Sequence, residues 1–544
     1  MNKFKRRFTT LLSLLFLAQL TYAQSGGENN YLLISLISLV VVMLLFAILS
    51  VSNNLIQVEA KNAGVDLDKK NSGVLSSAAS IFDNTKPPSY MKEGSFYKFK
   101  KGFDLKLVGD VKEASIEQIH ASRYAIRPID FNGISPIPKV VLEVGGEVKA
   151  GDVLFFDKKR PEIQYVSPVS GEIVEVRRGA KRAITEVIIL ADKDVQYKSL
   201  NAPSLANADR EAVRNFLIEN GGWTLINERP FDVVPEIDTV PRDIFISTFD
   251  TAPLALDYNL VVNGNEEAFQ AGLDALNTLT DGSVYLGLDA RKGKKPADAF
   301  INATGVKTNY FKGVHPAGNV GIQIHHVSPI KPGDKVWTLG VQDVITIGKM
   351  FTEGKFDASR VVAIVGDKIN TPKNVRTYVG ASIADLTAGN VKEGNNRIIA
   401  GDVFSGEKVN NESFLPLHAD QITVIEEGDY YEPFGWLLPK LKASNSKTFP
   451  SFILPNHKYK GDTNTHGEQR AFVVTGEYED VLPMNIYPQH LMKAIMTGDF
   501  EKMEGLGINE LTEEDVAVCE FVCTSKMPLQ QILREGLDMM KEQA

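Results

Sequence analysis

Residues 141–190 constrain the fold more than any other stretch, because they contain two similar halves built from short strands and tight turns. The first half covers residues 144–154 and the second covers 167–176, and each sets alternating apolar residues between glycine or proline turns. Such alternation is typical of half-buried strands joined by tight loops. The two halves therefore predict a two-fold β-sandwich.

The turn between the two halves lacks the residue that a carrier domain would need there. The pattern resembles lipoyl and biotinyl carrier domains, in which the connecting hairpin presents a lone lysine for the swinging arm. Here the hairpin Asp157–Pro161 is a charged turn closed by a proline. We therefore expect a lipoyl/biotinyl-like barrel-sandwich scaffold without an arm, in which Lys158 and Lys159 belong to a docking surface.

The N-terminal residues have the pattern of a membrane-targeting region. Residues 1–23 combine basic residues, an apolar run and small residues, as in a secretory signal peptide. Residues 31–52 follow with 22 positions that include no Asp, Glu, Lys or Arg. At ~1.5 Å per residue, a helix of this length spans a ~30 Å hydrocarbon core. The sequence therefore predicts a transmembrane helix over 31–52 and a polar linker over 53–95.

The charges after this segment predict where the body of the chain lies. Basic residues return only from Lys61 onward, and the positive-inside bias then places the following residues in the cytoplasm. Two cysteines in 544 residues suit a reducing compartment. We expect a single-pass protein of the bacterial inner membrane with most of the chain cytoplasmic. The formal net charge of −9 argues against nucleic acid as a partner.

The soluble body predicts several domains. From about 207 to 355, helices such as Glu266–Leu279 alternate with apolar strands such as Val284–Leu288, which is the rhythm of a Rossmann-like sheet. Strands dominate again after Arg360, and helices dominate from about 480. The expected fold is multidomain α/β and α+β. Its domains are a barrel-sandwich domain at 96–200, a Rossmann-like α/β domain at 201–355, a β-grasp (SLBB-like) domain at 356–440 and a C-terminal helical domain at 441–544.

The usual motifs for a nucleotide, a metal or a cluster are absent from the sequence. Gly-x-Gly-x-x-Gly follows none of the expected strands, and in the glycine-rich run Gly313–Gly321 a proline removes one amide hydrogen from any phosphate cradle. Cys519 and Cys523 are too few to build a zinc or iron–sulfur site. His325 and His326 are adjacent, so on a strand they would point to opposite faces. We expect no bound cofactor and no metal.

Many ordered stretches of the body match one family. From about Phe96 onward the chain resembles the NqrA family, the A subunits of Na⁺-translocating NADH:quinone oxidoreductases. The matches run in the same order along nearly the whole body. They are 100–105, 157–159, 167–171, 178–182, 229–231, 250–255, 315–321, 342–349, 434–437, 466–471 and 513–523.

The resemblance implies a role within a larger complex. That complex oxidises NADH, reduces a quinone and exports Na⁺, while its flavins and iron–sulfur centre lie on other subunits. NqrA is implied to be a cofactor-free cytoplasmic part that is not catalytic alone and sits beside the quinone-site membrane subunit. Quinone itself is a further candidate ligand. The candidate residues for contact with quinone or with other subunits are Lys158, Lys159, Lys181, Arg182 and His315.

Two alternatives from other classes stay open at this point. One is a membrane-anchored periplasmic adaptor of an efflux system, which also joins a membrane segment to a lipoyl-like sandwich. Such adaptors insert a long helical hairpin between the sandwich halves, whereas Leu154 and Ser167 are close in this sequence. The other is an electron-transfer subunit like RnfC, which would need two sets of four cysteines.

Overall fold

The computed structural model describes residues 86–543, except 135–136, 433–434, 436–441, 446–452 and 455, together with Ser38, Val40, Val41 and Ile48. The expected signal segment, and all but these four residues of the expected transmembrane helix, lie outside the described residues. The chain divides into two compact units, Met1–Pro87 and Pro88–Ala544. Within the described part, no helix has both the length and the apolar character to cross a bilayer.

The barrel-sandwich predicted from 141–190 is present. One sheet has the order β3-β9-β8-β5 and the other has the order β4-β6-β7. Gly171 begins β8 with φ +152°, and a Cβ there would lie 2.0 Å from the carbonyl oxygen of Leu190, so this turn requires glycine. The strands are β3 (Arg123–Ile126), β4 (Lys139–Val140), β5 (Glu147–Val148), β6 (Val153–Asp157), β7 (Arg160–Val166), β8 (Gly171–Arg178) and β9 (Ile184–Ala191).

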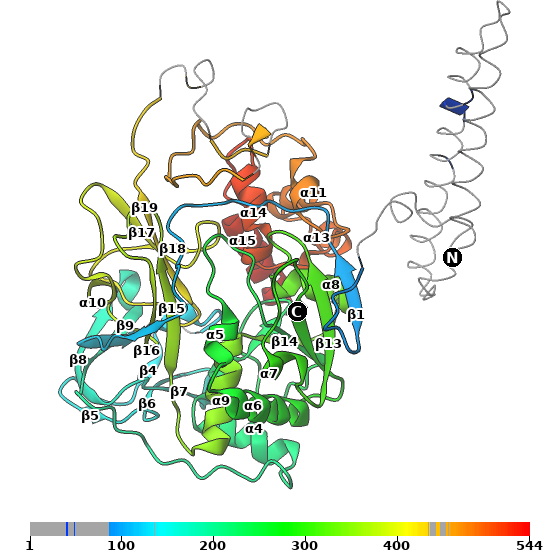
Figure 1. Ribbon diagram of the computed structural model, residues 1–544. Coiled ribbons are helices and arrows are strands. Elements are labelled where there is room, and N and C mark those ends of the chain that lie inside the picture. Colours follow the sequence, from blue (N-terminus) through cyan, green and yellow to red (C-terminus); the bar gives the residue numbers. More distant parts are fainter. Residues whose placement is uncertain are drawn as a thin grey trace, which may run out of the picture. The chain divides into compact units, whose positions relative to one another are not determined.

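A six-stranded sheet forms the centre of the α/β domain, in the order β1-β13-β12-β11-β14-β10. Three of its strands, β1, β13 and β14, are labelled in Figure 1. All its pairings are parallel except that of β10 with β14. The strand order reverses between β11 and β14, because the chain runs outward from β11 through β12 and β13 and then returns to place β14 on the other side of β11. The strands are β1 (Ser95–Lys98), β10 (Asn227–Arg229), β11 (Asp243–Ser247), β12 (Val284–Asp289), β13 (Val306–Lys312) and β14 (Val336–Leu339).

Helices cover both faces of this sheet. Ile244 and Ile246 of β11 join the cluster that contains helices α6 and α9, whereas Phe245 packs with Ile324 of α8. Successive side chains of a strand point to opposite faces, so this alternation places the two helix layers. The helices are α4 (Arg210–Glu219), α5 (Tyr258–Val262), α6 (Glu266–Leu279), α7 (Asp298–Ile301), α8 (Val320–Val327) and α9 (Val341–Thr352).

The third domain is built on a mixed sheet with the order β18-β17-β19-β15-β16-β2. Its central strand β15 pairs parallel with β19 and antiparallel with β16. These elements are β2 (Ile116–Gln118), β15 (Ser359–Val365), β16 (Lys373–Tyr378), α10 (Ile383–Thr387), β17 (Asn396–Ala400), β18 (Glu407–Val409) and β19 (Gln421–Glu426).

Helices form the C-terminal region from Glu477 onward, later than the start of the expected range 441–544, and they have their own core. Apolar side chains from its helices form a cluster that also takes in Ile322 of α8. This contact joins the helices to the α/β domain. They are α11 (Glu477–Val481), α12 (Pro488–Met496), α13 (Phe500–Gly505), α14 (Glu513–Val522) and α15 (Leu529–Gln543).

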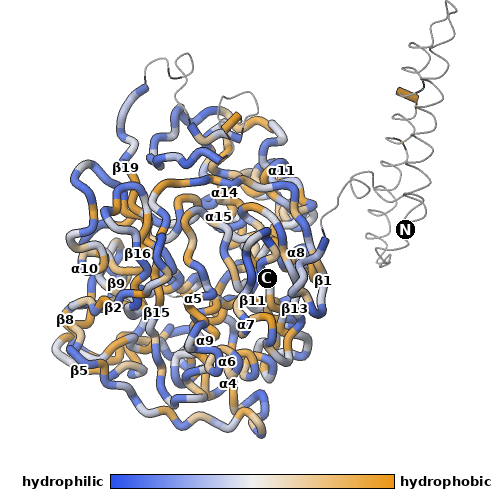
Figure 2. Tube along the Cα trace, viewed as in Figure 1, coloured by the Kyte–Doolittle hydropathy of each residue, from blue (hydrophilic) through white to orange (hydrophobic). Residues whose placement is uncertain are grey.

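The first three domains are more interwoven than the expected ranges suggest. β1 and β2, which lie at or near the start of the expected barrel-sandwich range, pair instead with β13 of the α/β sheet and β16 of the third sheet. One continuous apolar cluster also runs through all three domains. Figure 2 shows the corresponding hydrophobic stretches distributed throughout this body. The three domains therefore share one core.

Candidate functional site

A recess of about 480 Å³ opens beyond the carboxyl ends of β11 and β14. Ser247 and Leu339, the last residues of these two strands, both line it. In open α/β sheets, ligands bind outside the carboxyl ends of strands where the strand order reverses. Side chains of the third domain and of the C-terminal helices complete the walls. The recess therefore lies where three domains meet.

The stretches that carry the family resemblance converge on this recess. Five of them, far apart in the sequence, each contribute at least one lining residue. These contributions are Arg229 from 229–231, Asp250 and Ala252 from 250–255, His315, Gly318, Asn319 and Val320 from 315–321, Asp343 from 342–349, and Glu513 and Glu514 from 513–523. The fold thus brings together residues that the sequence shows only as separate motifs.

Arg229 anchors one side of the recess. Its side chain is 3% exposed and makes ion pairs of 3.0 Å with Asp515 and 2.9 Å with Glu514. Burial, and then the negative charge of Asp515, raise the pKa of Glu514 to about 8. Gly321 leaves room for this contact, because a Cβ there would lie 2.2 Å from an Asp515 carboxylate oxygen. The α8 N-terminus and α14 therefore meet around one buried arginine.

Arg360 is a second buried arginine of the recess, and like Arg229 it pairs with two carboxylates. It makes ion pairs with Asp343 and, at 3.1 Å, with Asp420. Burial raises the pKa of Asp420. For Asp343, burial acts in the same direction, but the charges of Arg360 and His418 outweigh it and lower the pKa. Tyr258 donates its hydroxyl to Asp420 at 2.9 Å, which ties α5 to the third domain.

Asp250, Asp402 and His315 form a third group. Asp250 accepts the backbone N–H of Ala252 at 2.8 Å, and Asp402 accepts that of Phe404 at 2.6 Å. Neither carboxylate makes an ion pair with a side chain in the described part of the body. Burial and the charge of Asp402 raise the pKa of Asp250.

His315 is the one predicted contact residue that lines the recess. The residue is 5% exposed, and its ring stacks on that of Phe404 with centroids 5.1 Å apart. Nδ1 lies 3.4 Å from the Thr251 hydroxyl, whereas Nε2 has no partner among the described residues. Burial lowers the pKa of this imidazole, although Asp402 and Asp250 act against that shift. His315 is therefore a neutral side chain with one nitrogen unused.

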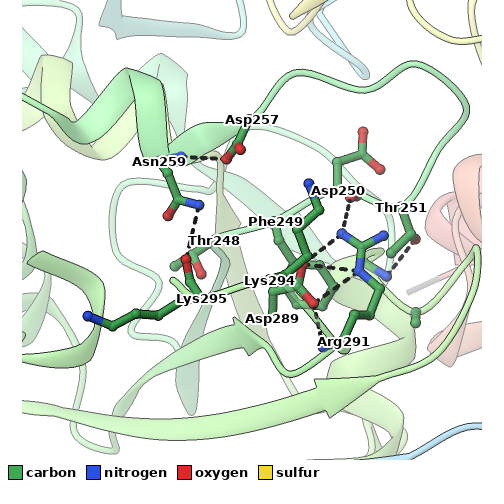
Figure 3. A network of polar contacts seen from close by, with 12 residues as sticks. Thr248, Phe249, Asp250, Thr251, Asp257, Asn259, Asp289, Arg291, Lys294 and Lys295 are labelled. Atoms are coloured by element: carbon green, nitrogen blue, oxygen red, sulfur yellow. Dashed lines mark hydrogen bonds and ion pairs between the residues drawn. The ribbon is translucent and has the colours of Figure 1, made fainter. Parts of the chain in front are cut away.

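Arg291 braces the loop that carries Asp250. Its guanidinium binds Asp289 at the end of β12, at 2.7 Å, and donates to the backbone carbonyl of Asp250 at 3.2 Å (Figure 3). Thr251 accepts the backbone N–H of Gly318 at 2.9 Å. These contacts tie the segment after β11 to β12 and to the glycine-rich run, and they fix the position of Asp250.

The other predicted contact residues lie outside the recess. Lys158 and Lys159 lie in the β6–β7 turn, and Lys181 and Arg182 lie in the turn between β8 and β9. The neighbours of the two turns differ: Arg160 donates to the carbonyl of Val234, whereas Arg177 donates to that of Glu412. The role of these basic residues as contacts for quinone or other subunits stays a prediction.

The structure also places the two adjacent histidines and the two cysteines that the sequence singled out. His325 and His326 lie on α8, so the strand geometry considered for them is wrong. His325 Nδ1 contacts Glu510 and His326 Nε2 contacts the Pro483 carbonyl, each at 2.6 Å, and both fix α8 to the C-terminal region. Cys519 and Cys523 are free and buried. Among the residues described, no group of three or more His, Cys, Asp or Glu could hold a metal ion.

The sequence did not identify Asp402, Asp420 or Arg360 as site residues. They come from the third domain, where no matched motif lies near them in the sequence, and only the fold places them beside Asp250 and Asp343. Arg229 and Glu514 could have been found, because both lie in stretches that match the family.

Comparisons with known proteins agree with this picture. Family models described as the NqrA N-terminal barrel-sandwich hybrid domain, the NqrA second alpha/beta domain and the NQRA C-terminal domain match residues 97–192, 208–356 and 361–411. A solved NAD⁺-reducing [NiFe]-hydrogenase aligns over 64% of this chain and 67% of its own, at 12% identity and a TM-score of 0.31, too low to support an argument.

Full-length relatives are much more similar. The A subunit of the Na(+)-translocating NADH-quinone reductase of Alcanivorax borkumensis is 39% identical over 81% of this chain and 98% of its own length. The corresponding proteins of Vibrio atlanticus and Saccharophagus degradans are each 38% identical over 82% of this chain and 99% of their own lengths. The chain therefore belongs to the NqrA family, the A subunits of the Na(+)-translocating NADH-quinone reductases.

Proposed function

We propose that this chain is the A subunit of a Na⁺-translocating NADH-quinone reductase, and that it supports the transfer of electrons from NADH to a quinone coupled to the export of Na⁺. The observation that carries the proposal is the 98% coverage of a curated relative at 39% identity. Neither alternative class accounts for it. The sandwich halves are joined directly by the β6–β7 turn, without the helical hairpin of an efflux adaptor.

Deletion of the gene, with complementation, tests this proposal. Membranes that lack the chain are expected to lose Na⁺-stimulated quinone reduction by NADH, and an affinity-tagged copy should restore it and co-purify the other subunits. Normal Na⁺-stimulated activity in the deletion strain would contradict the proposal. Purification of the tagged chain without any companion protein would also contradict it.

Within the complex, the chain acts without a flavin or nicotinamide nucleotide of its own. The charge of the recess supports this: its walls contribute seven Asp or Glu side chains, of which Glu514 with its pKa of about 8 is mostly protonated at neutral pH, against two Arg side chains and His418. Both arginines are engaged by carboxylates. Phosphate groups would be repelled by such a surplus of negative charge. The absorption spectrum of the purified chain should show no flavin band. A band that corresponds to one flavin per chain would refute the proposal that the chain binds no flavin.

The two basic turns are candidate docking contacts for the other subunits or for the quinone. Lys158 and Lys159 occupy one turn, and Lys181 and Arg182 occupy the other. Their position at turns and their charge in an otherwise acidic protein support this role. Photo-crosslinkers placed at each turn in the assembled complex should capture another subunit. A quinone photoprobe tests direct contact of these turns with the quinone, and it tests the same contact at His315.

Residues 31–52 are proposed to anchor the chain once through the inner membrane, with the body in the cytoplasm. The support is their length and lack of charge together with the basic residues that follow. Alkaline phosphatase fused after residue 70 should be inactive, because that enzyme matures only in the periplasm. High activity of the fusion would place the body outside.

A further inference from the structure

Basic side chains gather at one corner of the α/β sheet, where β1, β12 and β13 end. The segments 98–103 and 312–314 begin at the last residues of β1 and β13, and the segment 290–297 follows β12 directly. Together they contain no Asp or Glu, although the whole chain has a formal net charge of −9. We call this surface the basic corner. Its eight cations are Lys98, Lys100, Lys101, Arg291, Lys292, Lys294, Lys295 and Lys312.

The fold holds the three segments of the basic corner side by side. β13 pairs parallel with both β1 and β12, so the carboxyl ends of all three strands meet at one edge of the sheet. The backbone N–H of Phe99 donates to the carbonyl of Lys312, and that of Ala290 donates to the carbonyl of Phe311, each at 2.8 Å. Because neighbouring strands lie about 4.8 Å apart, the ends of β1 and β12 are about 10 Å apart. This spacing is close to the Debye length of about 8 Å at physiological ionic strength, so the charges act together.

Most of this positive charge is not neutralised by the protein itself. Arg291 pairs with Asp289 at 2.7 Å, and Lys295 pairs with Asp298 at 2.9 Å. The next carboxylate along the first segment, Asp104, pairs with Lys106 at 3.3 Å. Five lysines of the basic corner make no ion pair with any residue in the described part of the chain, and all but the last are exposed: Lys100, Lys101, Lys292, Lys294 and Lys312.

The kind of cation favours a broad anionic surface over a single small anion. Seven of the eight are lysines, whose ammonium groups are point charges on flexible stems. The one guanidinium, the group that clamps a phosphate through two hydrogen bonds, is already engaged by Asp289. None of the eight side chains lines the recess. The basic corner therefore suits headgroups spread over a surface.

We propose that the basic corner binds the anionic phospholipid headgroups of the membrane. Clusters of about 4–8 Lys or Arg close to a membrane attract the anionic lipids of its cytoplasmic leaflet. β1 is also the first strand that the structure describes after the proposed anchor at 31–52. The inference rests on the proposed function in one respect, because it needs the body beside the cytoplasmic leaflet. An anionic leaflet attracts this corner and repels the acidic remainder of the chain, so that the contact orients the body.

The rate at which lysines are acetylated in nanodiscs tests the proposal. The full chain, alone and within the purified complex, is placed in discs of phosphatidylcholine or of an equal mixture with phosphatidylglycerol, and a water-soluble acetylating reagent is added. Lys100, Lys101, Lys292 and Lys294 should react about fivefold more slowly on the anionic discs, which corresponds to about 1 kcal/mol for each lysine. About 1 M NaCl, which shortens the Debye length to about 3 Å, should abolish the difference. Lys331, exposed in the loop before β14, is the internal control and should react equally on both discs.

A variant set tests whether the effect belongs to the basic corner. Replacing the four lysines with Gln (Lys100→Gln, Lys101→Gln, Lys292→Gln and Lys294→Gln) should remove the slower reaction of Lys295 on anionic discs. The matched control removes the same charge from four other exposed lysines and should leave that slower reaction in place. These are Lys149, Lys193, Lys331 and Lys460.

Three outcomes would overturn the proposal. Equal rates on the two kinds of disc for the wild-type chain would show that no anionic lipid is bound, whatever the variants do. Equal slowing of Lys331 would show a general effect of the discs. Slow reaction within the complex on both kinds of disc, but not in the chain alone, would assign the basic corner to another subunit. A chain that co-purifies with no other subunit would contradict the proposed function, whereas the comparison of discs can still be made with that chain alone.

Discussion

At the scale of single residues, buried arginines hold the domains together through charge. Arg229 belongs to the α/β domain and its partners Glu514 and Asp515 belong to α14, so the ion pairs cross a domain boundary. The same is true of Arg360 and Asp343, which join the third domain to α9. Removing one member of such a pair leaves a buried charge without compensation.

Arg229→Met should therefore destabilise the protein strongly. Asp515 is fully buried and would lose its cation, so we expect a loss of about 3–5 kcal/mol in the free energy of unfolding. Chemical denaturation of the wild type and the variant measures this difference. Arg210→Met is the matched control, because Arg210 pairs with the exposed Asp281, and its effect should stay below about 1 kcal/mol. Similar losses for both variants would contradict the argument.

Glu427 should make stability depend on acid pH. Hydrogen bonds from Arg397 and Thr463 lower its pKa to about 2, from an ordinary value of 4.5. Because the folded-state pKa is the lower one, its contribution is complete above pH 4.5 and is lost as the pH falls toward 2. Glu427→Gln should lose about 1–2 kcal/mol at neutral pH and flatten the stability profile between these two values.

The comparison is the neighbouring Glu426, whose ion pair with Lys368 is half-exposed. Glu426→Gln should change stability little and leave the steep acid limb in place. Urea denaturation at a series of pH values measures both profiles. Parallel profiles for the wild type and Glu427→Gln would show that Glu427 contributes nothing to the acid limb.

At the scale of elements, helices α6 and α9 approach each other closely at glycines. A Cβ on Gly348 would lie 1.7 Å from the carbonyl oxygen of Ala268, and one on Gly272 would lie 2.2 Å from that of Val344. Both would meet rigid backbone, so the helices would have to move apart. Because α9 also carries Asp343 at its first turn, the position of the recess depends on this packing.

Gly348→Ala should therefore destabilise the protein despite the better helix propensity of alanine. We expect a loss of about 1–3 kcal/mol from overpacking. Gly505→Ala is the matched control, since Gly505 is also helical but a Cβ there would meet no atom within 4 Å, and it should be neutral or stabilising by up to about 1 kcal/mol. Thermal denaturation of both variants checks the contrast, and a neutral Gly348→Ala would mean that the helices can separate freely.

The periodicity of the sequence predicts elements better than it predicts their partners. Helix α6 has the expected bounds Glu266–Leu279, because its apolar face repeats over several turns. The short strands β1 and β2 have no such pattern, and nothing local specifies that they pair with β13 and β16. Helix α8 was missed for a similar reason, since a short apolar run does not distinguish a helix from a strand.

The candidate site was predictable only in part. His315 and the matched stretch around Asp250 lie in the recess, but Asp402 and Asp420 come from a different domain and reach it through tertiary packing. The clusters of charged residues in the sequence also did not indicate where the recess lies. The conspicuous basic turns lie outside the recess, whereas the buried charges that shape it are dispersed over almost 300 residues, from Arg229 to Glu514.

At the scale of the whole molecule, the body should be independent of the N-terminal segment. Deletion of residues 1–60 should leave a soluble, folded protein, because residues 88–544 form one compact unit with its own cores. Circular dichroism and size-exclusion chromatography of the truncated chain measure this. An aggregated or unfolded product would show that the N-terminal residues are needed for folding.

Strands β1 and β2 each pair with a strand that the ribosome synthesises much later. Ser95 pairs with Asn309, and Ile116 pairs with Asn374, 258 positions later. At about 5–20 residues per second, roughly 13–50 seconds pass between the synthesis of β2 and that of its partner. The barrel-sandwich, which ends at Ala191, is synthesised early in this interval, and the partner of β1 follows at residues 306–312, but β2 stays without its partner until β16 is made. The nascent chain therefore passes through a long stage in which two strands wait for their partners, and unpaired strands of this kind are prone to pair with other chains.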